Sequence, residues 1–157
     1  MEGRELREYI SSKAALICTA AFFISLFADR LTKYAALRLG WSTSLNAGLS
    51  FGLFSETGSS VVTAASAVIL LILLILCVHC ARWRGPLFRL GGGFMLGGAA
   101  GNLMDRLSCG QVIDWFPLPM SEIFFRGGLW INAADIFLSA GAAMIFFALW
   151  KEHKSGS

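Results

Sequence analysis

The chain has 157 residues, of which 56% are hydrophobic and 15% charged, and its formal net charge is +3 at pH 7. A composition this apolar excludes an ordinary soluble domain. We expect one integral membrane domain over residues 1–157, in contact with membrane lipids and without a nucleic-acid partner.

Four apolar blocks follow one another along the chain, at about residues 14–28, 60–80, 87–103 and 131–150. A helix needs roughly 20 residues to cross a bilayer, so each block predicts a transmembrane helix. Basic residues precede the first block, as in a secretory signal, but no small-residue cleavage site follows, so we interpret it as a retained span. The third block contains Gly97, Gly98 and Gly101, which are expected to let a neighbouring helix approach closely. The fold class predicted is an all-α membrane protein.

The distribution of lysine and arginine predicts the orientation of these spans. Eight basic residues flank the blocks on one side and five lie on the other. The positive-inside rule places the larger group, and with it both termini, in the cytoplasm. Segments 29–59 and 104–130 would then lie outside. The larger group is Arg4, Arg7, Lys13, Arg82, Arg84, Arg89, Lys151 and Lys154, and the smaller is Arg30, Lys33, Arg38, Arg106 and Arg126.

Ionisable residues at the ends of three apolar blocks share one depth. Asp29, Arg106 and Asp135 each lie about 24 to 26 Å from the inner basic residue of their own block, at about 1.5 Å per helical residue. That depth is just inside the outer face of a hydrocarbon core about 30 Å thick. A charge at the middle of a span costs on the order of 2.5 to 3.5 kcal/mol, so such residues usually have a function or a partner.

The spacing of the polar residues in this layer places them in pairs on common helix faces. Two pairs are four residues apart and one pair is three apart. The pairs are Asp29 with Lys33, Asn102 with Arg106, and Asn132 with Asp135.

A further carboxylate, Asp114, lies in the stretch GQVIDWFPL, which has β-branched residues and no helical period. We predict an extended segment at the outer interface, with Trp115 and Phe116 at headgroup level. Asp114 and Asp135 are then two carboxylates at similar depth. Such a pair shares one proton, so that the ionised member acts as a general base on water and the protonated member polarises a carbonyl.

Other chemistries have less support. His79 and His153 both lie on the cytoplasmic side, so no serine, cysteine and histidine set and no metal-binding spacing is present, and neither a metal nor a cofactor is expected. The alternative role for the aspartates is only to fix helix ends by pairing with Arg106, Lys33 or Arg126. A small proton-coupled or ion-conducting protein is the alternative function, although the inner halves of the spans lack the ionisable residues of a relay. A structural assembly subunit is a third interpretation.

Five motifs, in order along the chain, resemble those of bacterial lipoprotein signal peptidase (signal peptidase II). DRLTK at 29–33 is similar to the family's D-x-x-T-K, and NAGLSFGLF at 46–54 to its N-x-G-x-[AS]-F-G. GGAAGNLMDRL at 97–107 is similar to G-G-x-x-G-N-x-x-D-R-L, and VIDW at 112–115 to V-x-D-[FW]. INAADIFLSAG at 131–141 is similar to [FW]-N-x-A-D-x-x-[IL]-x-x-G.

The resemblance implies an intramembrane aspartyl endopeptidase of the bacterial cytoplasmic (inner) membrane, with its active site at the extracytoplasmic face. The substrate implied is a lipid-modified prolipoprotein, cut before its diacylglyceryl-modified cysteine. Asp114 and Asp135 would form the catalytic dyad, and Asp29 and Lys33 would support the first span. The residues implied to line the site are Asn46, Gly48, Asn102, Arg106 and Asn132.

Two outer segments are expected to complete the site. SLNAGLSFGLF, at 44–54, mixes apolar residues with turn formers and predicts a strand-like element. Phe51, Phe54 and Trp115 are candidates to flank the substrate's lipid. The short segment 121–128 is expected to flex over the site.

Overall fold

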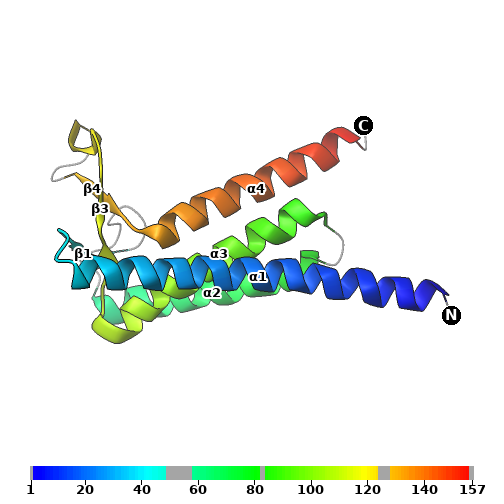
Figure 1. The fold of residues 1–157 in the computed structure, drawn as a ribbon, viewed down its shortest axis with the longest axis horizontal. Coiled ribbons are helices and arrows are strands. Elements are labelled where there is room, and N and C mark those ends of the chain that lie inside the picture. Colours follow the sequence, from blue (N-terminus) through cyan, green and yellow to red (C-terminus); the bar gives the residue numbers. More distant parts are fainter. Residues whose placement is uncertain (1, 49–57, 82–83, 124–127, 156–157) are drawn as a thin grey trace.

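The computed structural model describes residues 2–48, 58–81, 84–123 and 128–155. Its long helices are α1 (Glu2–Arg38), α2 (Ser59–Ala81), α3 (Pro86–Cys109) and α4 (Ala133–Ser155). Its strands are β1 (Ser44–Asn46), β2 (Val112–Asp114), β3 (Phe116–Leu118) and β4 (Leu129–Ile131), with a short 3-10 helix at Ser121–Ile123. The strands gather at one end of the helices, and both termini lie toward the other end (Figure 1).

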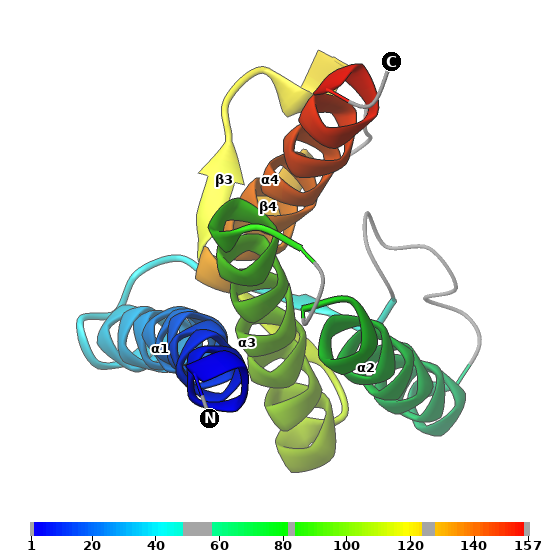
Figure 2. The same ribbon diagram turned by 90° about the vertical axis from the view of Figure 1, so that its right-hand side faces the viewer.

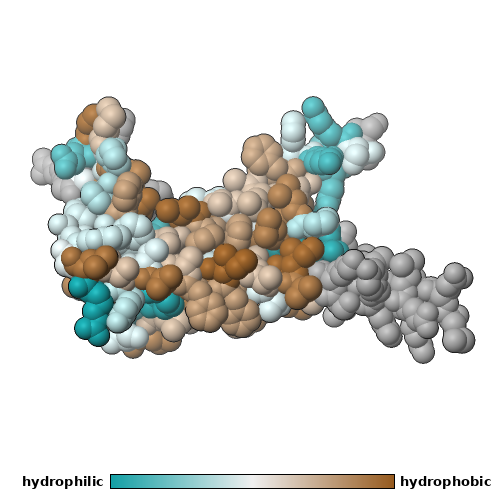
Figure 3. All heavy atoms as spheres, in the orientation of Figure 1, coloured by the Kyte–Doolittle hydropathy of each residue, from teal (hydrophilic) through white to brown (hydrophobic). Residues whose placement is uncertain are grey.

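Three of the described helices are long and apolar enough to cross a membrane: α1 from Ala15 onward, α2 and α4. On the face shown in Figure 3, hydrophobic residues cover the middle of the molecule and hydrophilic residues gather toward its ends. The fourth predicted span corresponds to α3, whose glycines and polar residues lower its mean hydropathy. The four-span topology and the single domain therefore remain predictions.

The helices extend beyond the apolar blocks. α1 continues through residues 29–38, and α3 continues past the end of its block to Cys109, where Gly110 caps it at a φ of 77°. Asp29 and Arg106 are thus helical residues, as the spacing of the predicted pairs requires. Asn132 precedes α4, which begins at Ala133.

Helix α3 lies at the centre of the bundle, between α1, α2 and α4 (Figure 2). Its glycines allow this packing, as predicted. A Cβ atom added to Gly98 would lie 2.7 Å from the backbone oxygen of Ala134, and one added to Gly91 would lie 2.7 Å from that of Gly141. The close approach brings the polar residues of α3 beside the first turn of α4.

The strands form two antiparallel pairs at the helix ends that lie opposite the termini. β1 pairs with β2, with Ser44 opposite Asp114 and Asn46 opposite Val112. β3 pairs with β4, with Phe116 opposite Ile131. A strand-like element is therefore present at residues 44–46, while the predicted segment 49–54, including Phe51 and Phe54, and residues 124–127 lie outside the described residues.

Candidate functional site

The two predicted dyad residues line one cavity. Asp114 ends β2 and is 2% exposed, and Asp135 lies in the first turn of α4 and is partly buried. The cavity has a volume of about 790 Å³, and Asn46, Asn102 and Arg106 also line it. The structure therefore brings together side chains from β1, β2, α3 and α4 that are distant in the sequence.

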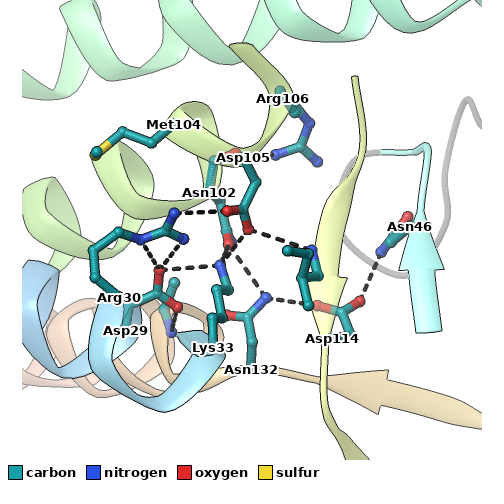
Figure 4. Close-up of polar contacts among 12 residues, drawn as sticks. Asp29, Arg30, Lys33, Asn46, Asn102, Met104, Asp105, Arg106, Asp114 and Asn132 are labelled. Atoms are coloured by element: carbon teal, nitrogen blue, oxygen red, sulfur yellow. Dashed lines mark hydrogen bonds and ion pairs between the residues drawn. The ribbon is translucent and has the colours of Figure 1, made fainter. Parts of the chain in front are cut away.

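Asparagine side chains connect the two carboxylates, and Figure 4 shows the part of this network around Asp114. The Asn132 Nδ2 donates to Asp114 Oδ1 at 2.6 Å and to Asn102 Oδ1 at 3.2 Å. The Asn102 Nδ2 in turn donates to Asp135 Oδ1 at 3.1 Å. From the end of β1, the Asn46 Nδ2 donates to Asp114 Oδ2 at 3.3 Å. Amide donors thus hold both carboxylates without supplying a charge of their own.

Asp135 is also held by the start of its own helix. The backbone N–H of Asn132 donates to Asp135 Oδ2 at 3.1 Å, and the backbone N–H of Asp135 donates to Asn132 Oδ1 at 3.1 Å. This reciprocal arrangement is a capping box, and it places Asp135 at the positive end of the helix dipole. The predicted common face of Asn132 and Asp135 is confirmed.

A layer of charged residues lies beside the asparagines. Lys33 Nζ is 3.0 Å from Asp29 Oδ2, which confirms the predicted pair, and 2.7 Å from Asp105 Oδ2. Arg30 lies 2.7 Å from Asp105 and 2.8 Å from Asp29. Lys33 Nζ also donates to Asn102 Oδ1 at 2.9 Å. Asp105 and Arg30 were not among the predicted site residues, although Asp105 follows Asn102 by three positions on the same helix.

The charged layer fixes the segments that carry the dyad. Asp29 Oδ1 accepts a hydrogen bond from the backbone N–H of Ala134, at the start of α4, at 3.1 Å. Asp105 Oδ2 accepts one from the backbone N–H of Ile113, the residue before Asp114, at 3.3 Å. α1 and α3 thereby hold the start of α4 and the strand β2.

Arg106 is buried beside the dyad, and among the described residues it has no carboxylate within ion-pair distance. Its Nη2 donates to the backbone oxygen of Gly48 at 2.5 Å, and its Nη1 to that of Asn102 at 3.4 Å. Its Nε is buried and has no hydrogen-bond partner in the described part of the chain. The predicted common face of Asn102 and Arg106 is confirmed, since both line the cavity.

The aspartates divide into two environments. Asp29 is paired with two cations, whereas Asp114 and Asp135 have no cation within 4 Å among the described residues. The pairing that would only fix helix ends thus applies to Asp29, and Arg126 lies outside the described residues. Burial, followed by the negative charge of Asp135, raises the pKa of Asp114 to about 6, against the opposing effects of Asn132, Asn46 and Lys33.

The cavity continues from the carboxylates between apolar walls. Ile69 and Leu73 of α2, Met95 of α3, and Ile136 and Leu138 of α4 line this part. The cavity therefore joins a polar, proton-binding end to an apolar region between the helices.

Comparison with known proteins gives consistent matches. The family model described as signal peptidase (SPase) II matches residues 21–151. A lipoprotein signal peptidase from Cyanothece sp. is 37% identical over 109 residues, which are 67% of this chain and 57% of the relative. One from Nitrobacter hamburgensis is 32% identical over 127 residues, covering 76% of this chain and 71% of the relative. The match thus spans little more than half the length of the Cyanothece protein.

A solved structure described as a bacterial membrane enzyme, determined by the in meso method, has the same fold. It superposes with a TM-score of 0.69 at 21% identity, over 93% of this chain and 92% of the other.

Proposed function

The chain belongs to the signal peptidase II family, and we propose that it is an intramembrane aspartyl endopeptidase that removes signal peptides from prolipoproteins. Cleavage occurs before the diacylglyceryl-modified cysteine. The observation that carries this proposal is the presence of two carboxylates in one cavity, linked by amides, with no cation of the described residues within ion-pair distance.

Asp114 and Asp135 act as the catalytic dyad. One carboxylate, ionised, takes a proton from a water molecule as that water attacks the scissile carbonyl carbon. The other, protonated, donates a hydrogen bond to the carbonyl oxygen, and a proton is later delivered to the leaving amine. The raised pKa of Asp114 supports the sharing of one proton by the pair, because ionising both neighbouring carboxylates in a buried site is unfavourable.

The surrounding residues hold the dyad in place and bind the substrate. Asn46, Asn102 and Asn132 hold the carboxylates, and Gly48 holds the Arg106 guanidinium through its backbone oxygen. Arg106 lines the cavity, and its guanidinium is a donor of the kind that a peptide carbonyl accepts. The apolar walls of the cavity suit acyl chains, and its volume lies within the range of about 300–1,000 Å³ typical of ligand sites.

The membrane arrangement is part of the same proposal. The protein spans the cytoplasmic (inner) membrane of a bacterium four times, with α3 as the additional span, and both termini are cytoplasmic. The dyad then lies at the extracytoplasmic face, where the lipid-modified cysteine of a prolipoprotein is held by its acyl chains. Asp29 and Lys33 support the outer end of α1.

The test is cleavage of a purified prolipoprotein in detergent or vesicles. We expect the wild-type protein to shorten the lipidated precursor, seen as a faster-migrating product on a gel, with mass spectrometry locating the new N-terminus at the modified cysteine. The matched control is the same precursor without the lipid, which should remain intact. Cleavage at another bond, or equal cleavage of both precursors, would contradict the proposed specificity.

A further inference from the structure

Four charged side chains form a compact, electrically balanced group next to the dyad. Asp29 and Asp105 supply two negative charges, and Arg30 and Lys33 supply two positive charges. Three of the four are almost fully buried, while the Arg30 side chain is 29% exposed. Uncompensated charges are costly in such a place, so the balance itself stabilises the group. We call these four residues the charged quartet.

Hydrogen bonds connect the charged quartet to the dyad. Lys33 Nζ, which lies between Asp29 and Asp105, donates to Asn102 Oδ1, and the Asn102 Nδ2 donates to Asp135 Oδ1. Because Lys33 holds the Asn102 oxygen, it fixes which end of that amide faces Asp135. A second path runs from Asp105 through the backbone N–H of Ile113 to the strand that carries Asp114.

We propose that the charged quartet is a positioning unit whose charge balance sets how readily the dyad holds its shared proton. The groups that act on Asp114 come from every neighbouring element: Lys33 from α1, Arg106 from α3, Asp135 from α4, and the amides of Asn46 and Asn132. Lys33 belongs both to this set and to the charged quartet. A change in quartet charge therefore reaches the dyad through the field as well as through the hydrogen bonds.

The proposal predicts that substitutions of two buried residues of the charged quartet have opposite effects on the shared proton. Asp105→Asn removes a negative charge and leaves the quartet with one excess positive charge. This excess lowers the affinity of the dyad for its shared proton. Lys33→Met leaves one excess negative charge, which raises this affinity. A loss of packing alone would not change the proton affinity of the dyad in opposite directions in the two variants.

The experiment is the pH profile of cleavage, measured as kcat/KM on lipidated precursor. This inference rests on the proposed function, because the profile is read from that reaction. Loss of the shared proton defines the alkaline limb of the profile. We expect this limb to move to lower pH in Asp105→Asn and to higher pH in Lys33→Met, each by on the order of half a pH unit or more. The double variant restores neutrality and should return the limb to the wild-type position.

The matched control is Glu152→Gln, which removes the pair between Arg84 and Glu152 at the opposite end of the helices. Its alkaline limb should coincide with that of the wild type. If either buried variant fails to fold, as judged by melting in detergent, Arg30→Gln provides the same test at a partly exposed position and should move the limb to higher pH.

The outcomes separate the two proposals. Limbs that do not move, or that move in the same direction in Asp105→Asn and Lys33→Met, would overturn the role of the charged quartet while leaving the peptidase activity intact. An unmoved limb in Arg30→Gln, where that variant is needed, would do the same. A wild-type protein that cleaves no lipidated precursor would contradict the proposed function instead.

Discussion

At the scale of single residues, Asp114 combines near-complete burial with two amide donors and no cation within ion-pair distance among the described residues. Its raised pKa has a consequence for stability. The folded state holds the proton more tightly than the unfolded chain, where an aspartate has a pKa of about 3.9. The stabilising contribution is therefore complete below about pH 4 and is lost as the pH rises through about 6.

Asp114→Asn removes this titrating group. We expect the melting temperature of the wild type in detergent to fall, relative to that of Asp114→Asn, as the pH rises from about 4 to about 7. The measurement is a series of melting curves of both proteins across that range. A constant difference between the two would show that Asp114 has an ordinary pKa in the folded protein.

Asn102 and Arg106 test the assignment of the residues around the dyad. We expect Asn102→Ala and Arg106→Ala to lower turnover by up to about 100-fold, because small displacements of reacting groups have effects of that size. Each also loses buried hydrogen bonds and some stability. Turnover per folded molecule separates the two effects. Normal turnover with a lowered melting temperature would assign both residues a structural role only.

At the scale of elements, the helices could be predicted from the sequence, but most contacts between them could not. Hydropathy indicated each long helix, and helical spacing predicted the pairing of Asp29 with Lys33. The pairs of Asp105 with Arg30 and Lys33 join α3 to α1, and in the sequence these residues look like ordinary charges at a helix end. Asn46 and Asp114 lie 68 positions apart, so only the pairing of β1 with β2 reveals their contact.

The apolar blocks did not show where the helices end, for a related reason. Apolar blocks report where a helix lies in the membrane, whereas its ends depend on capping groups. The capping box of Asn132 and Asp135 begins α4, and the left-handed conformation of Gly110 ends α3.

The contact between α3 and α4 gives a prediction at this scale. In Gly98→Ala the new Cβ would lie 2.7 Å from the backbone oxygen of Ala134, so the first turn of α4, which carries Asp135, must shift. We expect a loss of about 1–3 kcal/mol in stability together with reduced cleavage. Gly85→Ala is the matched control, because beyond its two chain neighbours no atom of the described residues lies within 4 Å of its added Cβ. Equal melting temperatures and activities for the two variants would contradict the close packing.

At the scale of the whole molecule, the strands β1 and β2, which carry Asn46 and Asp114, lie at the end of the bundle opposite the termini (Figure 1). More of the basic residues lie on the side of the termini than on the other side, which predicts that the termini are cytoplasmic. A C-terminal alkaline phosphatase fusion should therefore be inactive, and a C-terminal green fluorescent protein fusion should be fluorescent. The reverse result would invert the topology and place the dyad at the cytoplasmic face.

The central claim, that Asp114 and Asp135 work as one catalytic unit, is tested most directly by their asparagine variants. Asparagine keeps the shape of the side chain but removes the ionisable proton. We expect Asp114→Asn and Asp135→Asn each to lower cleavage of lipidated precursor by at least about 100-fold while the protein stays folded and inserted. The double variant should be little worse than either single one, because residues that act as a unit are non-additive. Cleavage at the wild-type rate by either folded single variant would contradict the aspartyl mechanism.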